Sequence, residues 1–267
     1  MKQQILSNLP GDHPWQNQIY WFDSIDSTNL EAKRMAQQGA AHGTVLIADH
    51  QTLGRGRLGR SFLSPAGTGI YLSVILRPSC APTELMHLTC ACAVAACDAV
   101  ETSAGFRPGI KWTNDLVYQG RKLAGILTEL SVDPKSGLVD YVIIGIGINC
   151  CQQEMDFDPS IRSFAGSLSM FSEYGADRGR VAAGLIQSLS AMDSALLSRQ
   201  PEIMAAYRVD CVTVGKDISL VRSDGNIRYG HAIDVDDAGA LLVRFPDGTE
   251  EAVNSGEVSV RGMYGYA

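Results

Sequence analysis

The chain has 267 residues, of which 45% are hydrophobic, and a formal net charge of −7 at pH 7. This length allows one large domain with a hydrophobic core and a second, small domain. The negative net charge disfavours general attraction to nucleic acid or to acidic membrane surfaces. The composition therefore predicts a folded protein without a broad polyanion-binding surface.

Neither a membrane span nor a secretion signal is predicted. The longest apolar run, from Leu85 to Val100, is interrupted by His87 and Asp98 and is shorter than a bilayer requires. The N-terminus lacks the extended apolar core of a signal peptide. Seven cysteines without a C-x-x-C pair predict reduced core thiols and no structural metal site. We therefore expect a cytoplasmic protein.

The first predicted strand covers residues 19–22, and a polar turn leads from it into a helix over residues 29–39. Ser27 or Thr28 can cap this helix, because their hydroxyls accept hydrogen bonds from its exposed N–H groups. The same N–H groups attract anions. A ligand at the start of this helix is therefore the alternative to simple capping.

Three arginines and three glycines share the seven positions from Gly54 to Arg60, between predicted strands over residues 44–48 and 70–76. Glycine lets the backbone approach a ligand closely, and arginine offers planar, charged donors for carboxylate and phosphate. The letters match G-x-G-x-x-G, but glycines and a proline in residues 61–69 forbid the helix of a dinucleotide-binding turn. The H-R-D and D-F-G motifs of kinases are absent. This segment predicts an anion-binding loop, with a solvated basic turn as the alternative.

A buried helix is predicted over residues 84–104, which are apolar on all sides. Beyond it, residues 110–118 and 122–130 are predicted to form a hairpin. An ordinary surface ion pair between Lys111 and Asp115 is one interpretation of its charges. The other is a site that gathers four polar side chains: Lys111, Asn114, Asp115 and Lys122.

Two segments of this acidic chain carry a net positive charge. Residues 49–60 carry a net charge of +2, and residues 107–123 carry +3. Two basic segments in an acidic protein favour a small anionic ligand over a polyanion.

A central strand is predicted over residues 141–149, where two glycines allow close backbone approach and Asn149 stands at the end. Residues 150–176 are predicted to be irregular, and residues 178–197 to form an amphipathic helix. From residue 212 onward, short β-runs separated by Asp-Gly turns predict a small β-domain. We therefore divide the chain into residues 1–210 and 211–267.

Several of these segments, in this order and spacing, resemble the motifs of biotin protein ligases. They are Ser27-Thr28-Asn29, Gln51 with Gly54 to Arg60, Lys111 to Leu116, Arg121 to Leu127, and Gly145 to Asn149. The resemblance implies an α+β catalytic domain in residues 1–210, with a mixed sheet and flanking helices of the class II aminoacyl-tRNA synthetase type. It also implies an SH3-like β-barrel in residues 211–267.

The resemblance implies that ATP, with Mg²⁺, activates biotin to biotinyl-5′-AMP, and that a lysine of a biotin carboxyl carrier protein then receives the biotin. Cationic side chains suit this chemistry, because they stabilise a carboxylate held against a polyphosphate. The resemblance implies catalytic roles for Arg57, Lys111 and Lys122. Biotin contacts carry over to Ser27, Thr28, Asn29, Gln51, Arg55, Gly56, Arg57, Lys122 and Gly125. ATP contacts carry over to Arg57, Arg60, Phe62, Lys111, Trp112, Asn114, Asp115 and Asn149.

The chain departs from the family pattern at Thr113, where proline is frequent, and at Phe62, where tryptophan is frequent. Phenylalanine leaves a smaller stacking partner for adenine. Fewer than 25 residues precede the first predicted strand, too few for the winged helix-turn-helix of some members, so DNA binding is not expected. Family members often form homodimers through the catalytic sheet. A lipoate ligase and a non-catalytic biotin- or nucleotide-binding regulator are the alternative functions, and the magnesium ligands stay unassigned.

Overall fold

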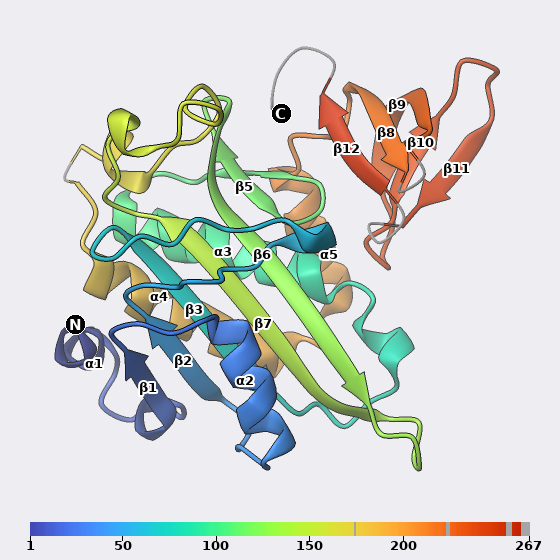
Figure 1. Ribbon diagram of the computed structural model, residues 1–267. Helices are drawn as coiled ribbons and strands as arrows, with labels where there is room; N and C mark the ends of the chain where they lie inside the picture. The colour runs from blue at the N-terminus through green and yellow to red at the C-terminus, as the bar shows by residue number, and fades with distance from the viewer. Residues whose placement is uncertain (174, 223–224, 255–257, 263–267) are drawn as a thin grey trace.

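The computed structural model describes residues 1–173, 175–222, 225–254 and 258–262. A seven-stranded sheet forms the centre of the large domain. A five-stranded sheet, built from the C-terminal part of the chain, lies to one side of it (Figure 1).

The large sheet is mixed, as predicted. Its strands lie in the order β1-β2-β3-β7-β6-β5-β4. Their bounds are β1 (Ile19–Phe22), β2 (Thr44–Ala48), β3 (Gly69–Leu76), β4 (Gly109–Lys111), β5 (Asp115–Tyr118), β6 (Arg121–Val132) and β7 (Val139–Asn149). The β1–β2 pair is parallel and the other neighbouring pairs are antiparallel. The predicted central strand is β7. The predicted hairpin was right only in its second half: residues 110–118, expected as one arm, form the two strands β4 and β5, which pair with each other, and only β5 pairs with β6.

Helices cover both faces of this sheet. In Figure 1, α2 lies in front of the sheet, and α3 and α4 lie behind it. The α-helices are α1 (Lys2–Asn8), α2 (Thr28–Gln37), α3 (Leu88–Ala104), α4 (Arg178–Ala195) and α5 (Gln200–Asp210). Short 3₁₀ turns occur at Gln16–Gln18, Arg57–Gly59, Pro82–Leu85, Glu154–Asp156 and Leu168–Met170.

The core lies between the sheet and these helices. Every residue of β2 and β3 is buried, because α2 packs on one face of the sheet and α4 on the other. All seven cysteines are free, and six of them are buried, which confirms the prediction of core thiols for those six. Cys151 is only half-buried.

A helix was predicted over residues 84–104, and its predicted start at residue 84 was wrong. Pro82–Leu85 forms a separate 3₁₀ turn, and α3 begins only after His87, whose ψ of 0° lies outside the helical range. The segment Pro82–Ala104 has the length and apolar composition of a membrane span. However, 67% of its most apolar window is buried inside the fold, as expected of a core helix.

The C-terminal sheet is antiparallel, as the predicted SH3-like domain requires. Its strands lie in the order β11-β10-β9-β8-β12. Their bounds are β8 (Asp217–Arg222), β9 (Ile227–Val235), β10 (Leu241–Arg244), β11 (Glu250–Val253) and β12 (Val258–Gly262). The predicted Asp247-Gly248 turn joins β10 to β11. The other predicted turn includes Asp224, which lies outside the described residues.

The small sheet packs directly against the large domain. The Val212 backbone N–H donates to the Ile110 carbonyl at 2.9 Å, and the Trp112 indole N–H donates to the Gly239 carbonyl at 3.0 Å. Helix α5, which the sequence analysis missed, lies just before this junction and buries Met204 and Tyr207. These bonds attach β4 and the loop that follows it to the C-terminal part of the chain.

A pH-dependent contact joins the turn before β2 to α4. His42 Nε2 lies 2.8 Å from Asp193 Oδ2, and this hydrogen bond raises the pKa of His42 above 6.5. A raised pKa means that the stabilisation is complete below pH 6.5 and is lost as pH rises through the folded-state pKa. The His42 side chain is 39% exposed, so we expect its contact with Asp193 to contribute less than about 1 kcal/mol to the free energy of unfolding.

The melting temperatures of wild type and His42→Gln should converge as pH rises from 6 to 9. A difference that stays constant over this range would contradict a pH-dependent contact.

Candidate active site

The N-terminus of α2 carries three of the predicted site residues, and all three are buried: Ser27, Thr28 and Asn29. Ser27 occupies the N-cap position, but its hydroxyl makes no capping hydrogen bond. Thr28 instead donates from its backbone N–H and its hydroxyl to Gln51 Oε1, at 2.9 and 3.1 Å. Gln51 therefore joins the helix start to the segment that leads into the Arg-Gly loop, defined as Gly54 to Arg60.

Two glycines of β7 provide the close approach that the sequence predicted. A Cβ at Gly145 would overlap the side-chain oxygen of Asn29. A Cβ at Gly147 would lie 2.6 Å from the Phe62 ring. Both φ angles fall outside the left-handed region, so the requirement is one of space. The glycines let α2 and the segment after the Arg-Gly loop settle on the same face of the sheet.

Gly145→Ala should therefore lower the free energy of unfolding by about 1–3 kcal/mol, because the added methyl group must displace the buried Asn29 side chain. Urea denaturation measures this change. Gly184→Ala is the matched control, because its Cβ would find only an ordinary contact, 3.7 Å from the Ala99 carbonyl oxygen. Equal stabilities of the two variants would show that the Asn29 contact does not constrain β7.

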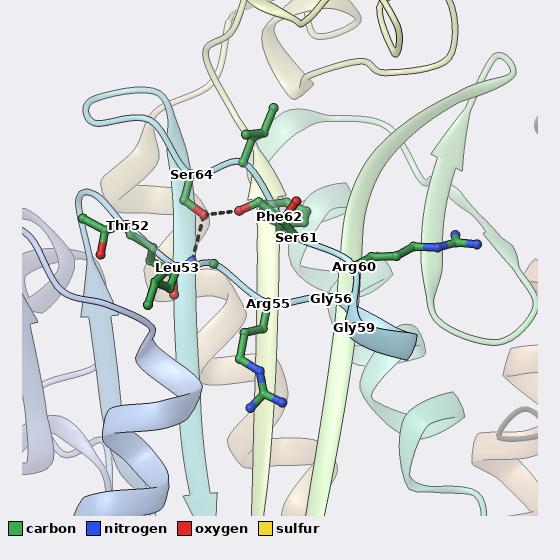
Figure 2. A pocket seen from close by; sticks show the side chains of 12 residues that line it. Thr52, Leu53, Arg55, Gly56, Gly59, Arg60, Ser61, Phe62 and Ser64 are labelled. Carbon is green, nitrogen blue, oxygen red and sulfur yellow. Dashed lines mark hydrogen bonds between the residues drawn. The ribbon is translucent and has the colours of Figure 1, made fainter.

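The Arg-Gly loop closes on itself through backbone hydrogen bonds. The Phe62 N–H donates to the Gly54 carbonyl at 2.9 Å, and the Gly56 N–H donates to the Arg60 carbonyl at 2.7 Å. A cavity of about 280 Å³ is lined by residues 51–56 and 59–64. Figure 2 shows Arg55 and Arg60 leaving the loop in different directions. The two side chains therefore point to different surroundings, and Arg55 reaches Glu129 on β6.

The cationic residues predicted to be catalytic gather around Asp115. Lys122 Nζ donates to Asp115 Oδ1 at 2.7 Å, and Lys111 stands directly opposite Asp115 in the β4–β5 pair. Residues opposite each other on paired strands project from the same face. Lys111 is only 8% exposed, so the alternative of a surface ion pair between Lys111 and Asp115 was wrong.

Arg57 approaches the same group from the Arg-Gly loop. Its Nη1 donates to Asn114 Oδ1 at 2.7 Å. Burial lowers the pKa of the Arg57 guanidinium, and the nearby Asp115 carboxylate opposes this shift. An arginine stays charged at neutral pH even so. Three cations from separate parts of the chain therefore share one region around Asp115.

Gly125 lies beside this cluster, and a Cβ there would stand 3.3 Å from Lys122 Nζ. Asn114 is fixed on β6, because its Nδ2 donates to the Ile126 carbonyl at 3.0 Å. Asn149, at the end of β7, donates to the Gly166 carbonyl at 2.9 Å.

One of the predicted ATP-binding side chains, that of Trp112, points toward the C-terminal sheet. The Trp112 indole N–H is engaged by the C-terminal sheet, as described above, and its ring is buried. Arg60 is exposed. The backbone of Trp112 still follows Lys111 directly, so the residue borders the cationic cluster.

Three further residues support the site, and the sequence analysis did not single them out. Ser73, fully buried on β3, lies 2.8 Å from Thr28 Oγ1 and 2.6 Å from Asn29 Oδ1. Glu129 on β6 contacts Asn29 and Arg55. Gln152 is buried and its Nε2 lies 3.4 Å from Asn149 Oδ1. A polar residue within an apolar strand was the available signal for Ser73, whereas Glu129 follows another polar residue, Thr128, on β6.

The arrangement has two chemically different ends. Hydroxyl and amide groups of α2 and Gln51 suit the neutral polar groups of a ligand. The cluster of Arg57, Lys111 and Lys122 suits carboxylate and phosphate, because fixed cations stabilise negative charge where it is held or develops. A site of this kind can join an acid to a nucleotide.

The chain is similar to known ligases. Residues 21–149 match the Biotin/lipoate A/B protein ligase family, and residues 213–261 match the Biotin protein ligase C terminal domain. The biotin–acetyl-CoA-carboxylase ligase of Mycobacterium tuberculosis is 34% identical over 87% of this chain and 85% of its own length. The bifunctional ligase/repressor BirA of Bacillus spizizenii is 35% identical over 94% of this chain and 76% of its own.

The solved structures include a biotin protein ligase from Aquifex aeolicus in complex with biotin and ATP. It superposes with a TM-score of 0.77 and 28% identity, over 92% of this chain and 99% of that one. Every predicted site residue lies within residues 21–149, the region that matches the first family. The chain belongs to the biotin protein ligase family.

Proposed function

We propose that this protein is a biotin protein ligase that forms biotinyl-5′-AMP from biotin and ATP and transfers the biotin to a lysine of a biotin carboxyl carrier protein. The observation that carries the proposal is the convergence of Arg57, Lys111 and Lys122 around Asp115, in a chain whose relatives are biotin ligases.

The first step forms a bond between a carboxylate oxygen of biotin and the α-phosphorus of ATP. The bond from this phosphorus to the bridging oxygen breaks, and pyrophosphate leaves. The step brings two anions together, so fixed positive charge lowers its barrier. Lys122 and Arg57 would hold the carboxylate and the α-phosphate, and Lys111 would neutralise phosphate charge. No protein nucleophile is required, and positioning supplies much of the rate.

In the second step the neutral ε-amine of the carrier lysine attacks the carbonyl carbon of the mixed anhydride. An amide bond forms, AMP leaves, and the amine loses its proton. The Arg-Gly loop would cover the intermediate, because its Arg57 reaches Asn114 and lies near Asp115, the partner of Lys122. Covering the anhydride excludes the water that would hydrolyse it.

Biotin and ATP would bind at opposite ends of the site. The hydroxyls and amides of Ser27, Thr28, Asn29 and Gln51 would bind the polar ring of biotin, with Arg55 and Gly56 beside them. Gly125 would lie beside Lys122, where the biotin carboxylate is held. The nucleotide would lie toward Asn114, Asn149 and Phe62. A ring of Phe62 packed on Gly147 offers adenine an apolar surface, smaller than that of tryptophan.

Magnesium would enter with ATP. Among the described residues, no three His, Cys, Asp or Glu side chains gather to hold a metal ion. Asp115 offers one carboxylate beside the phosphate-binding cations, and Mg²⁺ is commonly held by one carboxylate together with phosphate oxygens and water. Asp115 and the neighbouring cations therefore fit a Mg²⁺ ion that is bound to ATP and would neutralise part of the phosphate charge.

The decisive experiment mixes the protein with ATP, Mg²⁺ and either biotin or lipoate. Mass spectrometry should detect biotinyl-AMP and little lipoyl-AMP. Lipoyl-AMP alone would establish a lipoate ligase. Biotin binding without any biotin-dependent ATP–pyrophosphate exchange would establish a non-catalytic binding protein instead.

A further inference from the structure

Glu129 stands on β6 where α2 and the Arg-Gly loop meet, and nothing in the reaction scheme above uses it. Its side chain is 27% exposed, and both carboxylate oxygens are engaged. Oε2 accepts from Asn29 Nδ2 at 3.0 Å, and Oε1 accepts from Arg55 Nη1 at 3.2 Å. One carboxylate therefore joins a residue of the helix to a residue of the loop.

The Asn29 side chain, which binds one oxygen of Glu129, is held in place by its other contacts. Asn29 is 5% exposed, and its Oδ1 accepts from the Ser73 hydroxyl at 2.6 Å. It also rests on Gly145 of β7. Because buried, fully engaged amides have few alternative positions, Asn29 holds the Glu129 carboxylate in a fixed place.

The Arg55 side is the part that can vary. Arg55 is 43% exposed, and the loop from Gly54 to Arg60 is closed mainly by its own backbone bonds. Two arginines tie the loop to the sheet, Arg55 through Glu129 and Arg57 through Asn114. These two attachments lie over opposite ends of the site, one toward the hydroxyl and amide residues and one toward the cationic cluster.

We infer that Glu129 is a positioning residue for biotin: it holds Arg55, and with it the first half of the Arg-Gly loop, over the biotin end of the site. This inference rests on the proposed function. Glu129 acts through Arg55 and does not itself contact the reacting atoms. Losing its charge detaches the loop at the biotin end, while the attachment of Arg57 to Asn114 remains.

Glu129→Gln isolates this effect, because glutamine keeps the size of the side chain and an oxygen for Asn29 but loses the charge that holds Arg55. The KM for biotin in ATP–pyrophosphate exchange should rise about two- to fivefold. The KM for ATP and the kcat at saturating biotin should stay near the wild-type values. Without ligands, trypsin should cleave after Arg57 and Arg60 faster than in the wild type.

A double-mutant cycle separates a positioning role from a structural one. If Glu129 acts through Arg55, Glu129→Gln adds no further change in the biotin KM to an Arg55→Gln protein. Glu202→Gln is the matched control, because Glu202 forms an exposed ion pair with Arg199 on α5. It should change neither the biotin KM nor the cleavage rate.

Equal biotin KM values and cleavage rates in wild type and Glu129→Gln would overturn the inference. Multiplicative effects of Glu129→Gln and Arg55→Gln would also overturn it, since Glu129 would then act independently of Arg55. Failure of the proposed function is distinguishable from both, because the unmodified protein would then show no biotin-dependent exchange at all.

Discussion

Replacing Lys122 by methionine should lower the rate of biotin-dependent ATP–pyrophosphate exchange about 10²- to 10³-fold, the usual cost of removing one charged group that stabilises a transition state. Lys122 Nζ, 2.7 Å from Asp115, stands at the meeting point of β5, β6 and the Arg-Gly loop. Methionine keeps most of the side-chain length and removes the charge. The exchange assay at saturating biotin and ATP measures the change in kcat.

The substitution leaves Asp115 without its Lys122 partner, so folding must be checked separately. Lys122→Met combined with Asp115→Asn removes that imbalance, and its melting temperature should lie near the wild-type value. Lys135→Met removes one positive charge from an exposed turn and is the control for net charge. A folded Lys122→Met protein with less than a threefold loss of rate would remove Lys122 from the proposed mechanism.

Replacing Arg57 by glycine should release biotinyl-AMP about 10- to 10²-fold faster, because hydrogen bonds to a charged group contribute about 1.5–3 kcal/mol. Arg57 reaches from the loop to Asn114, over the region where the adenylate would lie. The released anhydride reacts with any exposed lysine, so the variant should biotinylate serum albumin that has no carrier sequence. Streptavidin blotting measures this labelling.

Arg57→Lys and Arg57→Ala separate the possible causes. Lysine keeps the charge but loses the planar pair of donors, so it should give an intermediate release rate. Alanine should match glycine if the side chain matters, and should release more slowly than glycine if chain flexibility matters. Slow, tight release from Arg57→Gly would show that Arg57 does not retain the intermediate.

The strands and most helices could be predicted because their signals are local. The short apolar run at residues 70–76 predicts a buried strand from its own composition, and these residues lie in β3. The Asp247-Gly248 pair predicts a hairpin turn from the backbone preferences of these two residues. Helix α5 was missed because it buries only Met204 and Tyr207, which leaves a weak periodic pattern. The start of α3 was misplaced because the break at His87 has no glycine or proline to signal it.

The roles of the supporting residues needed the folded chain. Trp112 stands within a motif that predicts ATP contact, yet its indole donor is engaged by Gly239, more than a hundred residues away in the chain. Ser73 gave only a weak signal, and its two partners on α2 follow from how α2 crosses β3. Side-chain direction depends on strand pairing and helix placement, which no short stretch of sequence encodes.

The sequence by itself determined the family, the mixed sheet with its small C-terminal β-domain, and the residue types of the site, because motif spacing and hydrophobic pattern are carried by neighbouring residues. Only the tertiary structure decided which groups meet: Arg57, Lys111 and Lys122 at Asp115, and Arg55 with Asn29 at Glu129. The physical reason is that both meetings depend on long-range packing, in which Gly145 and Gly147 let α2 and Phe62 close onto the sheet.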